Sequence, residues 1–188
     1  MKINKGQYGY RDSNRKIRLM ITLVLVAGIL AQLAARSLTD NQAAKNILTV
    51  MAILTVLPMA NMASPLLASW KYRTPSREFH QKIQTYEGKC TILYDLIVTT
   101  KEFVMPFDAV AVHPKGVYAY CISKKIDAAK AENALNALFA ANKLDPNVKV
   151  IKDEHSFLRR LDSLKPASEY EDDGTTAYAA SLMKSLSM

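Results

Sequence analysis

The sequence predicts an α/β (α+β) soluble domain with a mixed sheet, in the order α-β-β-β-α-β-α, preceded by a two-helix transmembrane hairpin. Three observations support this prediction. Residues 46–70 contain no Asp, Glu, Lys or Arg, and about 20 apolar helical residues cross a hydrocarbon core of roughly 30 Å. A second uncharged stretch, residues 19–35, precedes them closely. Beyond Lys71, β-branched runs alternate with segments of helical periodicity, which is typical of one small packed domain.

The net charge of +8 is unevenly distributed along the 188 residues. Residues 1–18 carry about +5, the connection between the apolar stretches about +1, residues 71–165 about +5, and the segment from Pro166 about −3. Lys and Arg concentrate on the cytoplasmic side of membrane spans, and anionic lipid attracts them. The charge therefore indicates membrane topology, with nucleic-acid binding as the alternative interpretation.

We expect the two spans at about residues 19–36 and 46–68, joined by a short polar connection that makes them antiparallel neighbours. A cleaved signal peptide is the alternative for the first span. Leu33 and Ala35 form a poor cleavage site and a second span follows almost at once, so a retained anchor is favoured. Basic residues precede the first span and follow the second, which places both termini in the cytoplasm.

The second span contains two prolines and one amide side chain. Pro58 and Pro65 each remove a backbone donor, which predicts a kink or a shortened helix. Asn61 is uncharged and isolated within the span. Two short spans without an ionisable residue make a poor transporter, so Asn61 indicates helix packing or self-association.

The first half of the soluble domain contains a short helix and three strands. Ser76 is an expected N-cap for a helix that ends near Thr85. The strands are expected at residues 90–99, 103–113 and 117–122, separated by a turn at residues 100–102 and a tight turn at 114–116. The last two strands form a predicted β-hairpin, and Tyr118 and Tyr120 alternate with small residues as packing side chains.

The second half adds two helices, a strand and a tail. Asp127 caps a helix that reaches about Asn142, and Asp153 caps another that carries an apolar stripe. Between them, residues 148–151 form a short strand. From Pro166 to Gly174 the chain is acidic and polar, which predicts a linker. Residues 175–188 form either a docking helix or a frayed terminus.

The cysteines and histidines show no metal-ligand or redox spacing. Cys90 and Cys121 lie in apolar runs and are expected to be buried structural thiols. His80, His113 and His155 lie on three different elements, so surface or turn positions are expected. Cys121 and His113 lie on facing strands, which leaves a cross-strand thiolate pair as an alternative, without a third group to orient it.

The candidate chemistry lies along the predicted β-hairpin. Asp108 begins an apolar run that leads through the turn Pro114-Lys-Gly116 into residues 117–120. In this pattern the chain resembles the nuclease-related domain (NERD) of the PD-(D/E)XK superfamily. That family shows an Asp, an apolar strand, a Pro-x-Gly turn and a second strand ending in Glu-x-Lys. The run Ile92–Ile97 is similar to its preceding strand, and the resemblance covers roughly residues 76–151.

The resemblance implies an α-β-β-β-α-β core and, in active members, a divalent cation held by the Asp and Glu. The family positions fall on Asp108, Cys121 and Ser123, so Cys replaces the Glu and Ser replaces the Lys. Cys is a poor ligand for Mg²⁺ and Ser supplies no cation. We therefore expect no catalytic residue, metal or cofactor, and Asp108 becomes a capping or hairpin-closing carboxylate. The alternative, a migrated metal site, would use Lys124, Lys125, Asp127 and either Glu78 or Glu87.

The sequence thus predicts four segments. Residues 1–18 form a basic cytoplasmic N-terminus, 19–70 the membrane hairpin, 72–165 a nuclease-like cytoplasmic domain, and 166–188 an acidic linker and tail. The expected function is binding or scaffolding by a catalytically degenerate, non-enzymatic domain at a bacterial plasma membrane. The alternatives are a membrane-anchored nuclease with a migrated site, and an accessory subunit of a larger membrane complex.

The expected partners are the lipid bilayer and a protein, which can be a second copy of the chain. Nucleic acid is a weaker candidate, and no feature indicates a small-molecule substrate.

Overall fold

The computed structural model describes residues 3–100, 104–123, 126–171 and 173–188. The chain divides into two compact units. Residues 12–71 form one unit, and the described residues up to Arg11 join residues 72–188 in the other. The soluble unit is therefore larger than the predicted segment 72–165, because it includes both ends of the chain.

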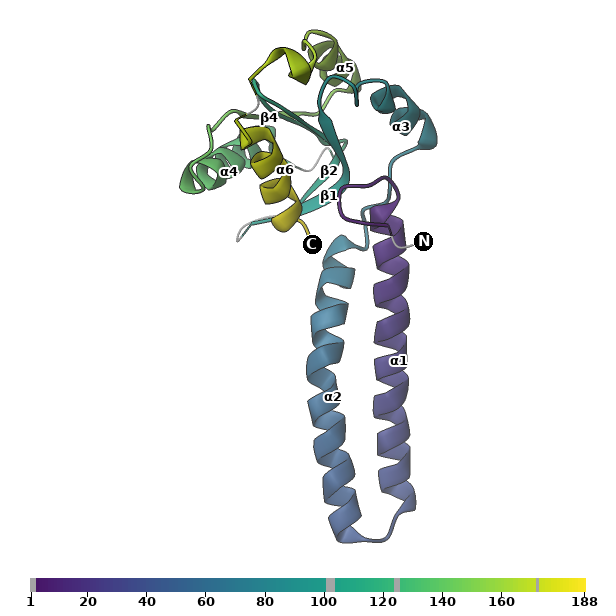
Figure 1. The fold of residues 1–188 in the computed structure, drawn as a ribbon. Helices are drawn as coiled ribbons and strands as arrows, with labels where there is room; N and C mark the ends of the chain where they lie inside the picture. Colours follow the sequence, from purple (N-terminus) through teal and green to yellow (C-terminus); the bar gives the residue numbers. More distant parts are fainter. Residues whose placement is uncertain (1–2, 101–103, 124–125, 172) are drawn as a thin grey trace. The chain divides into compact units, whose positions relative to one another are not determined.

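Two long apolar helices, α1 (Tyr10–Leu38) and α2 (Gln42–Ser69), confirm the predicted pair (Figure 1). Both are long and apolar enough to cross a membrane. The side chain of Asn41 caps α2 by accepting hydrogen bonds from the backbone N–H groups of Ala43 and Ala44. The helix continues through Pro58 and Pro65, so neither proline ends it.

The soluble unit contains a four-stranded mixed sheet, as predicted (Figure 1). Its strands are β1 (Thr91–Thr99), β2 (Val104–His113), β3 (Gly116–Tyr120) and β4 (Val148–Ile151), in that spatial order. The β1–β2 and β2–β3 pairs are antiparallel, and β3 pairs with β4 in parallel. The predicted turn at residues 100–102 lies outside the described residues except for Thr100, as does Phe103, the expected first residue of β2.

The β2–β3 hairpin is confirmed, with His113 opposite Gly116 across a two-residue turn. Gly116 has a φ of +140°, and a Cβ there would lie 2.6 Å from the backbone oxygen of Asn147. Glycine is therefore required at this position both for its conformation and for space. The strand β3 ends at Tyr120 rather than at Ile122.

Helices cover both faces of the sheet. The helices α3 (Arg77–Gln84) and α5 (Glu154–Asp162) bury Phe79, Ile83, Phe157 and Leu161 in a core with Tyr118 and Tyr120. The helices α4 (Ala128–Ala141) and α6 (Thr175–Ser185) pack against the second core, on the other face. The predicted N-caps Ser76, Asp127 and Asp153 are confirmed, because each side chain accepts backbone N–H bonds.

The two ends of the chain lie along the outer edge of β1. Gly6 and Ser187 each form an isolated bridge with this strand, opposite Tyr94 and Val98 respectively. The helix α6 buries Leu182 and Met183, so the tail docks rather than frays. Before it, the predicted acidic linker contains a short 3₁₀ helix, Ala167–Glu169. Exposed edge strands invite unwanted pairing, and here the chain's own ends take that place.

Candidate functional site

Asp108, the first residue of the predicted constellation, lies where the β1–β2 ladder is interrupted. Asp95 of β1 and Asp108 of β2 face each other between two regular pairs, Tyr94 with Ala109 and Leu96 with Phe107. Asp95 has a φ of +59°, a left-handed conformation that Asp tolerates better than most residues. Both aspartates are buried, at 1% and 4% exposure.

The strands exchange faces at this interruption. Leu93 and Leu96 are three residues apart, so a regular strand would place them on opposite faces. Both instead belong to the core on the α4 and α6 side, together with Phe107 and Val110 of the partner strand. The local twist that permits this exchange removes ladder hydrogen bonds next to the two aspartates, which leaves carbonyl oxygens that need other donors.

The guanidinium group of Arg11 supplies those donors. Its Nη2 donates to the carbonyl oxygens of Leu96 (3.1 Å) and Phe107 (2.6 Å). Its Nη1 donates to Asp108 Oδ1 (2.7 Å) and to the carbonyl oxygen of Arg73 (2.9 Å). Arg11 is itself only 6% exposed. Four hydrogen bonds therefore hold a buried cation against the interrupted ladder.

Asp95 holds the backbone around Arg11 in place through hydrogen bonds. Its Oδ2 accepts hydrogen bonds from the N–H of Gly9 (2.8 Å), the N–H of Arg11 (3.4 Å) and the hydroxyl of Thr74 (2.8 Å). Its Oδ1 lies 3.9 Å from Arg11 Nε, and neither of these two atoms has a hydrogen-bond partner among the described residues. Burial raises the pKa of Asp95 above its ordinary value, although Arg11 and these hydrogen bonds oppose the shift.

The N-terminal segment has further contacts around this cluster. The ring of Tyr8 stacks on His80 with their centroids 4.1 Å apart, and its hydroxyl donates to the carbonyl oxygen of Pro75. The backbone N–H of Tyr94 donates to the carbonyl oxygen of Gly6. We call Gly6–Arg11 the N-terminal clamp, because it joins the soluble unit through backbone, aromatic and ionic contacts.

The other positions implied by the family resemblance lie beside Asp108. The N–H of Ile122 donates to Asp108 Oδ2 at 3.1 Å, so Asp108 closes the β-hairpin as expected, while its second oxygen binds Arg11. Cys121 is fully buried and free, and burial raises the pKa of its thiol. A protonated thiol is a poor nucleophile and a poor metal ligand. Ser123 is half-buried.

The groups proposed for a migrated site lie elsewhere or have other roles. Asp127 caps α4, and Glu87 accepts a hydrogen bond from the hydroxyl of Tyr94. Glu78 is exposed in the first turn of α3, and Lys124 and Lys125 lie outside the described residues. In the part of the chain that the structure describes, no group of three or more His, Cys, Asp or Glu residues could hold a metal ion.

His113 lies at the β2–β3 turn, one of the two kinds of position expected for the histidines, and its side chain is buried, with 3% exposure. It pairs with Gly116 at the turn, whereas Cys121 lies at the opposite end of the β-hairpin, so the two cannot form a thiolate pair. The imidazole instead accepts the Lys115 N–H at Nδ1 and donates from Nε2 to the carbonyl oxygen of Lys165. Burial lowers the pKa of His113. His155 is exposed, as expected.

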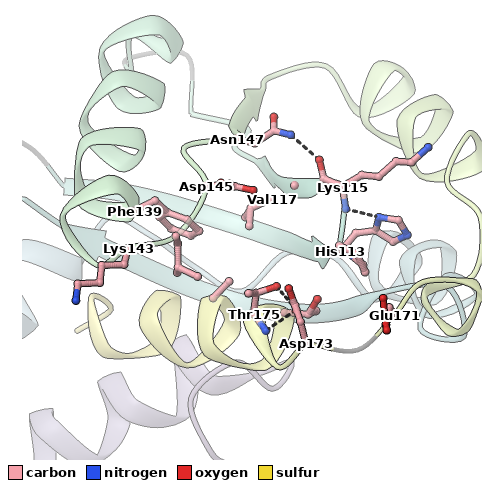
Figure 2. Close-up of a pocket in the computed structure, with 15 residues that line it drawn as sticks. His113, Lys115, Val117, Phe139, Lys143, Asp145, Asn147, Glu171, Asp173 and Thr175 are labelled. Atoms are coloured by element: carbon pink, nitrogen blue, oxygen red, sulfur yellow. Dashed lines mark hydrogen bonds between the residues drawn. The ribbon is translucent and has the colours of Figure 1, made fainter.

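A cavity of about 230 Å³ lies beside this histidine (Figure 2). Its wall is formed by the β2–β3 turn, the end of α4 and the start of α6. His113 binds Lys115, the amide of Asn147 donates to the Lys115 carbonyl oxygen, and Asp173 accepts from Thr175. These polar side chains are used to shape the fold, so the Arg11–Asp95–Asp108 cluster is the stronger candidate site.

Arg11 is the site residue that the sequence interpretation missed. It lies in a basic segment whose charge was assigned to membrane topology, and it is 97 residues away from Asp108. One signal was present: Asp95 and Asp108 each interrupt an otherwise apolar strand, and buried carboxylates need a cation or strong donors. That signal predicts a counter-charge but does not identify which of the basic residues supplies it.

Comparisons of this chain with protein-family models, with curated proteins and with solved structures found no match.

Proposed function

We propose that this chain is an integral membrane protein in which a helical hairpin anchors a nuclease-like cytoplasmic domain that binds or scaffolds and does not cleave. The observation that carries the proposal is the Arg11 guanidinium, which contacts Asp108 at 2.7 Å and faces Asp95 at 3.9 Å. Its positive charge lies where a divalent cation would have to bind these carboxylates.

A metal ion would have to displace this guanidinium from four hydrogen bonds. Breaking a buried ion pair by removing one partner costs about 3–5 kcal/mol. At the family Glu position the replacement site would offer the buried thiol of Cys121 in place of a carboxylate. Mg²⁺ prefers oxygen ligands in octahedral geometry. These features support binding without metal-dependent catalysis.

The surfaces of the two long helices support the membrane anchor. The most apolar windows of α1 and α2 are 0% and 6% buried within the structure. A core helix of a soluble protein would be mostly buried, and soluble proteins rarely expose large continuous apolar surfaces. Hydrocarbon covers such a surface without cost. The basic residues on both flanks favour the orientation in which the N- and C-termini are cytoplasmic.

A divalent-metal titration of the full chain in detergent tests the catalytic part of the proposal. We expect no saturable heat with Mg²⁺ or Mn²⁺ in calorimetry, and no cleavage of DNA or RNA in the presence of either ion. The matched variant Asp108→Asn keeps the size of the side chain and removes its charge. Metal binding or cleavage that is lost in Asp108→Asn would show that the site is an active nuclease centre and would refute the proposal.

A further inference from the structure

One face of α2 carries a regular pattern of exposed side chains. Seven residues of the helix recur at alternating spacings of three and four, and all seven are exposed. They are Ile47, Val50, Leu54, Leu57, Asn61, Ser64 and Ala68. We call them the α2 seam. Its spacing is the heptad pattern by which two helices pack along their length. The two buried residues of α2, Ala52 and Leu66, lie on the opposite face.

Asn61 is the one carboxamide in this seam. The inference rests on the proposed membrane insertion, which determines the depth of Asn61 in the bilayer. It lies ten residues before Lys71, about 15 Å along the helix axis, within the hydrocarbon region. No described contact gives its side chain a hydrogen-bond partner. A lipid tail cannot supply one, and a carboxamide has two donor hydrogens and an acceptor oxygen to satisfy.

Hydroxyl side chains of the same helix behave differently. Thr49, Thr55 and Ser69 donate to backbone carbonyl oxygens one turn earlier, at 2.8, 2.8 and 2.7 Å. These three residues therefore satisfy their polar groups inside their own helix and need no neighbour. Among the described residues, the seam side chains Asn61 and Ser64 have no such bond, and the carboxamide of Asn61 has the larger number of donors and acceptors to satisfy from outside this chain.

The two prolines of α2 add acceptors to the same seam. Pro58 and Pro65 follow the seam residues Leu54 and Asn61 by four positions. A helix residue normally donates its N–H to the carbonyl four residues earlier, and proline has no N–H to donate. The carbonyl oxygens of Leu54 and Asn61 are therefore deprived of that helical bond. In a membrane such groups are satisfied by a neighbouring helix.

We propose that a second copy of this chain covers the α2 seam, and that two α2 helices pair in parallel around a two-fold axis. All copies insert with the same orientation, so each Asn61 lies at the same depth as its equivalent in the partner. A carboxamide both donates and accepts, so two copies of Asn61 satisfy each other. Val50, Leu54 and Leu57 pack between them, and the small residues Ser64 and Ala68 permit close backbone approach.

Resonance energy transfer in vesicles measures this association. Full-length chains labelled with donor or acceptor are reconstituted into phosphatidylcholine vesicles, and transfer is followed as the lipid-to-protein ratio rises. We expect the dissociation constant of the Asn61→Leu variant to be about 3- to 30-fold higher than that of the wild type, the range for interhelical hydrogen bonds in membranes. The control Thr55→Val removes a hydroxyl on the opposite face and should leave association unchanged.

Cross-linking locates the contact. Single cysteines are placed at the seam positions Leu54, Leu57 and Ser64, or at Met59 and Ala63 as controls, and the vesicles are oxidised. Cys90 and Cys121 are buried and form little background. We expect cross-linked dimers from the seam positions. Cross-linked dimers from Met59 or Ala63 instead of the seam positions would refute pairing through the α2 seam. The absence of energy transfer between wild-type chains would also refute it.

A carbonate wash of the same vesicles separates this inference from the proposed function. If the chain stays in the washed membrane but shows no energy transfer, pairing through the α2 seam is refuted and the proposed membrane anchor is still supported. A chain that the wash extracts would refute both.

Discussion

At the residue scale, Arg11 determines the behaviour of two buried carboxylates. A buried ion pair is weak evidence of net stabilisation, because desolvation of both charges offsets their attraction. Removing one partner is different, since the remaining charge stays buried without compensation. Here the guanidinium also satisfies the carbonyl oxygens of Leu96 and Phe107, so its removal leaves neutral acceptors without donors as well.

The Arg11→Met substitution tests this dependence, because Met keeps the apolar stem and removes the charge. We expect the free energy of unfolding of the soluble unit to fall by about 3–5 kcal/mol. Pulse proteolysis of the full chain in urea, in detergent, measures it. Arg15→Met is the matched control: Arg15 stacks over Trp70 at 5.5 Å, an interaction worth about 0.5–1 kcal/mol at an exposed site. Equal effects of the two substitutions would contradict the ionic role of Arg11.

The pH dependence of stability should include a contribution from Asp95. Burial raises its pKa in the folded state, so between the unfolded value of about 3.9 and the folded value the native state binds more protons. Its contribution to stability therefore increases as the pH falls through the folded pKa toward 4. We expect the wild type to gain stability relative to Asp95→Asn over this range, measured by urea unfolding at several pH values. The opposite trend would mean that Arg11 outweighs burial.

At the element scale, the β2–β3 turn depends on one residue that has no side chain. Gly116→Ala would place a Cβ 2.6 Å from the Asn147 oxygen at a φ of +140°. We expect a loss of about 1–3 kcal/mol in the free energy of unfolding. Gly88→Ala is the control, since a Cβ there would meet no atom within 4 Å, and its effect should stay within about 0.5 kcal/mol. Urea denaturation of both variants distinguishes steric and backbone strain at residue 116 from a general effect of replacing a glycine.

The N-terminal clamp behaves as an element of the soluble unit, although α1 and α2 separate it from the rest in sequence. Arg11 contacts the carbonyl oxygen of Arg73 at 2.9 Å, so the ends of residues 12–71 are close to each other. A variant in which about eight Gly and Ser residues replace residues 12–71 should therefore fold as a soluble protein.

The same chain cut to residues 72–188 should be about 3–5 kcal/mol less stable than this linked variant, because Asp95 and Asp108 lose their cation. Chemical denaturation of both proteins measures the difference. Introducing Arg11→Met into the linked variant should reproduce most of the loss. Equal stability of residues 72–188 and the linked variant would show that the clamp contributes little to the fold.

At the scale of the whole molecule, the proposed topology makes the connection between α1 and α2 the part of the chain on the outer side of the membrane. Asp40 lies in this connection, and Ser168 lies in the soluble unit; both side chains are exposed. Asp40→Cys should react with a membrane-impermeant maleimide in intact cells, whereas Ser168→Cys should react only after permeabilisation. The reverse pattern would mean that the chain is inserted with the opposite orientation.

Local signals in the sequence were sufficient for much of the architecture. The uncharged run after Lys45 marks α2, the capping carboxylates Asp127 and Asp153 mark two helix starts, and the Pro-Lys-Gly turn marks the β-hairpin. Each of these features depends on residues a few positions apart, so pattern and propensity determine it. The mixed sheet followed from the short strands and the helix before β4.

The tertiary structure alone decided how the candidate site is built. Arg11 donates a hydrogen bond to Asp108, which is 97 positions away in the sequence. This contact depends on where the β1–β2 ladder is interrupted, and no local sequence pattern encodes that position. The burial of His113 and the docking of α6 likewise depend on which surfaces the folded sheet leaves uncovered. The sequence by itself determined the apolar helices, most of the strands and the positions of two aspartates within apolar runs, whereas their burial became clear only in the fold. The fold selected the cation that neutralises them, because only folding brings residues 11, 95 and 108 together.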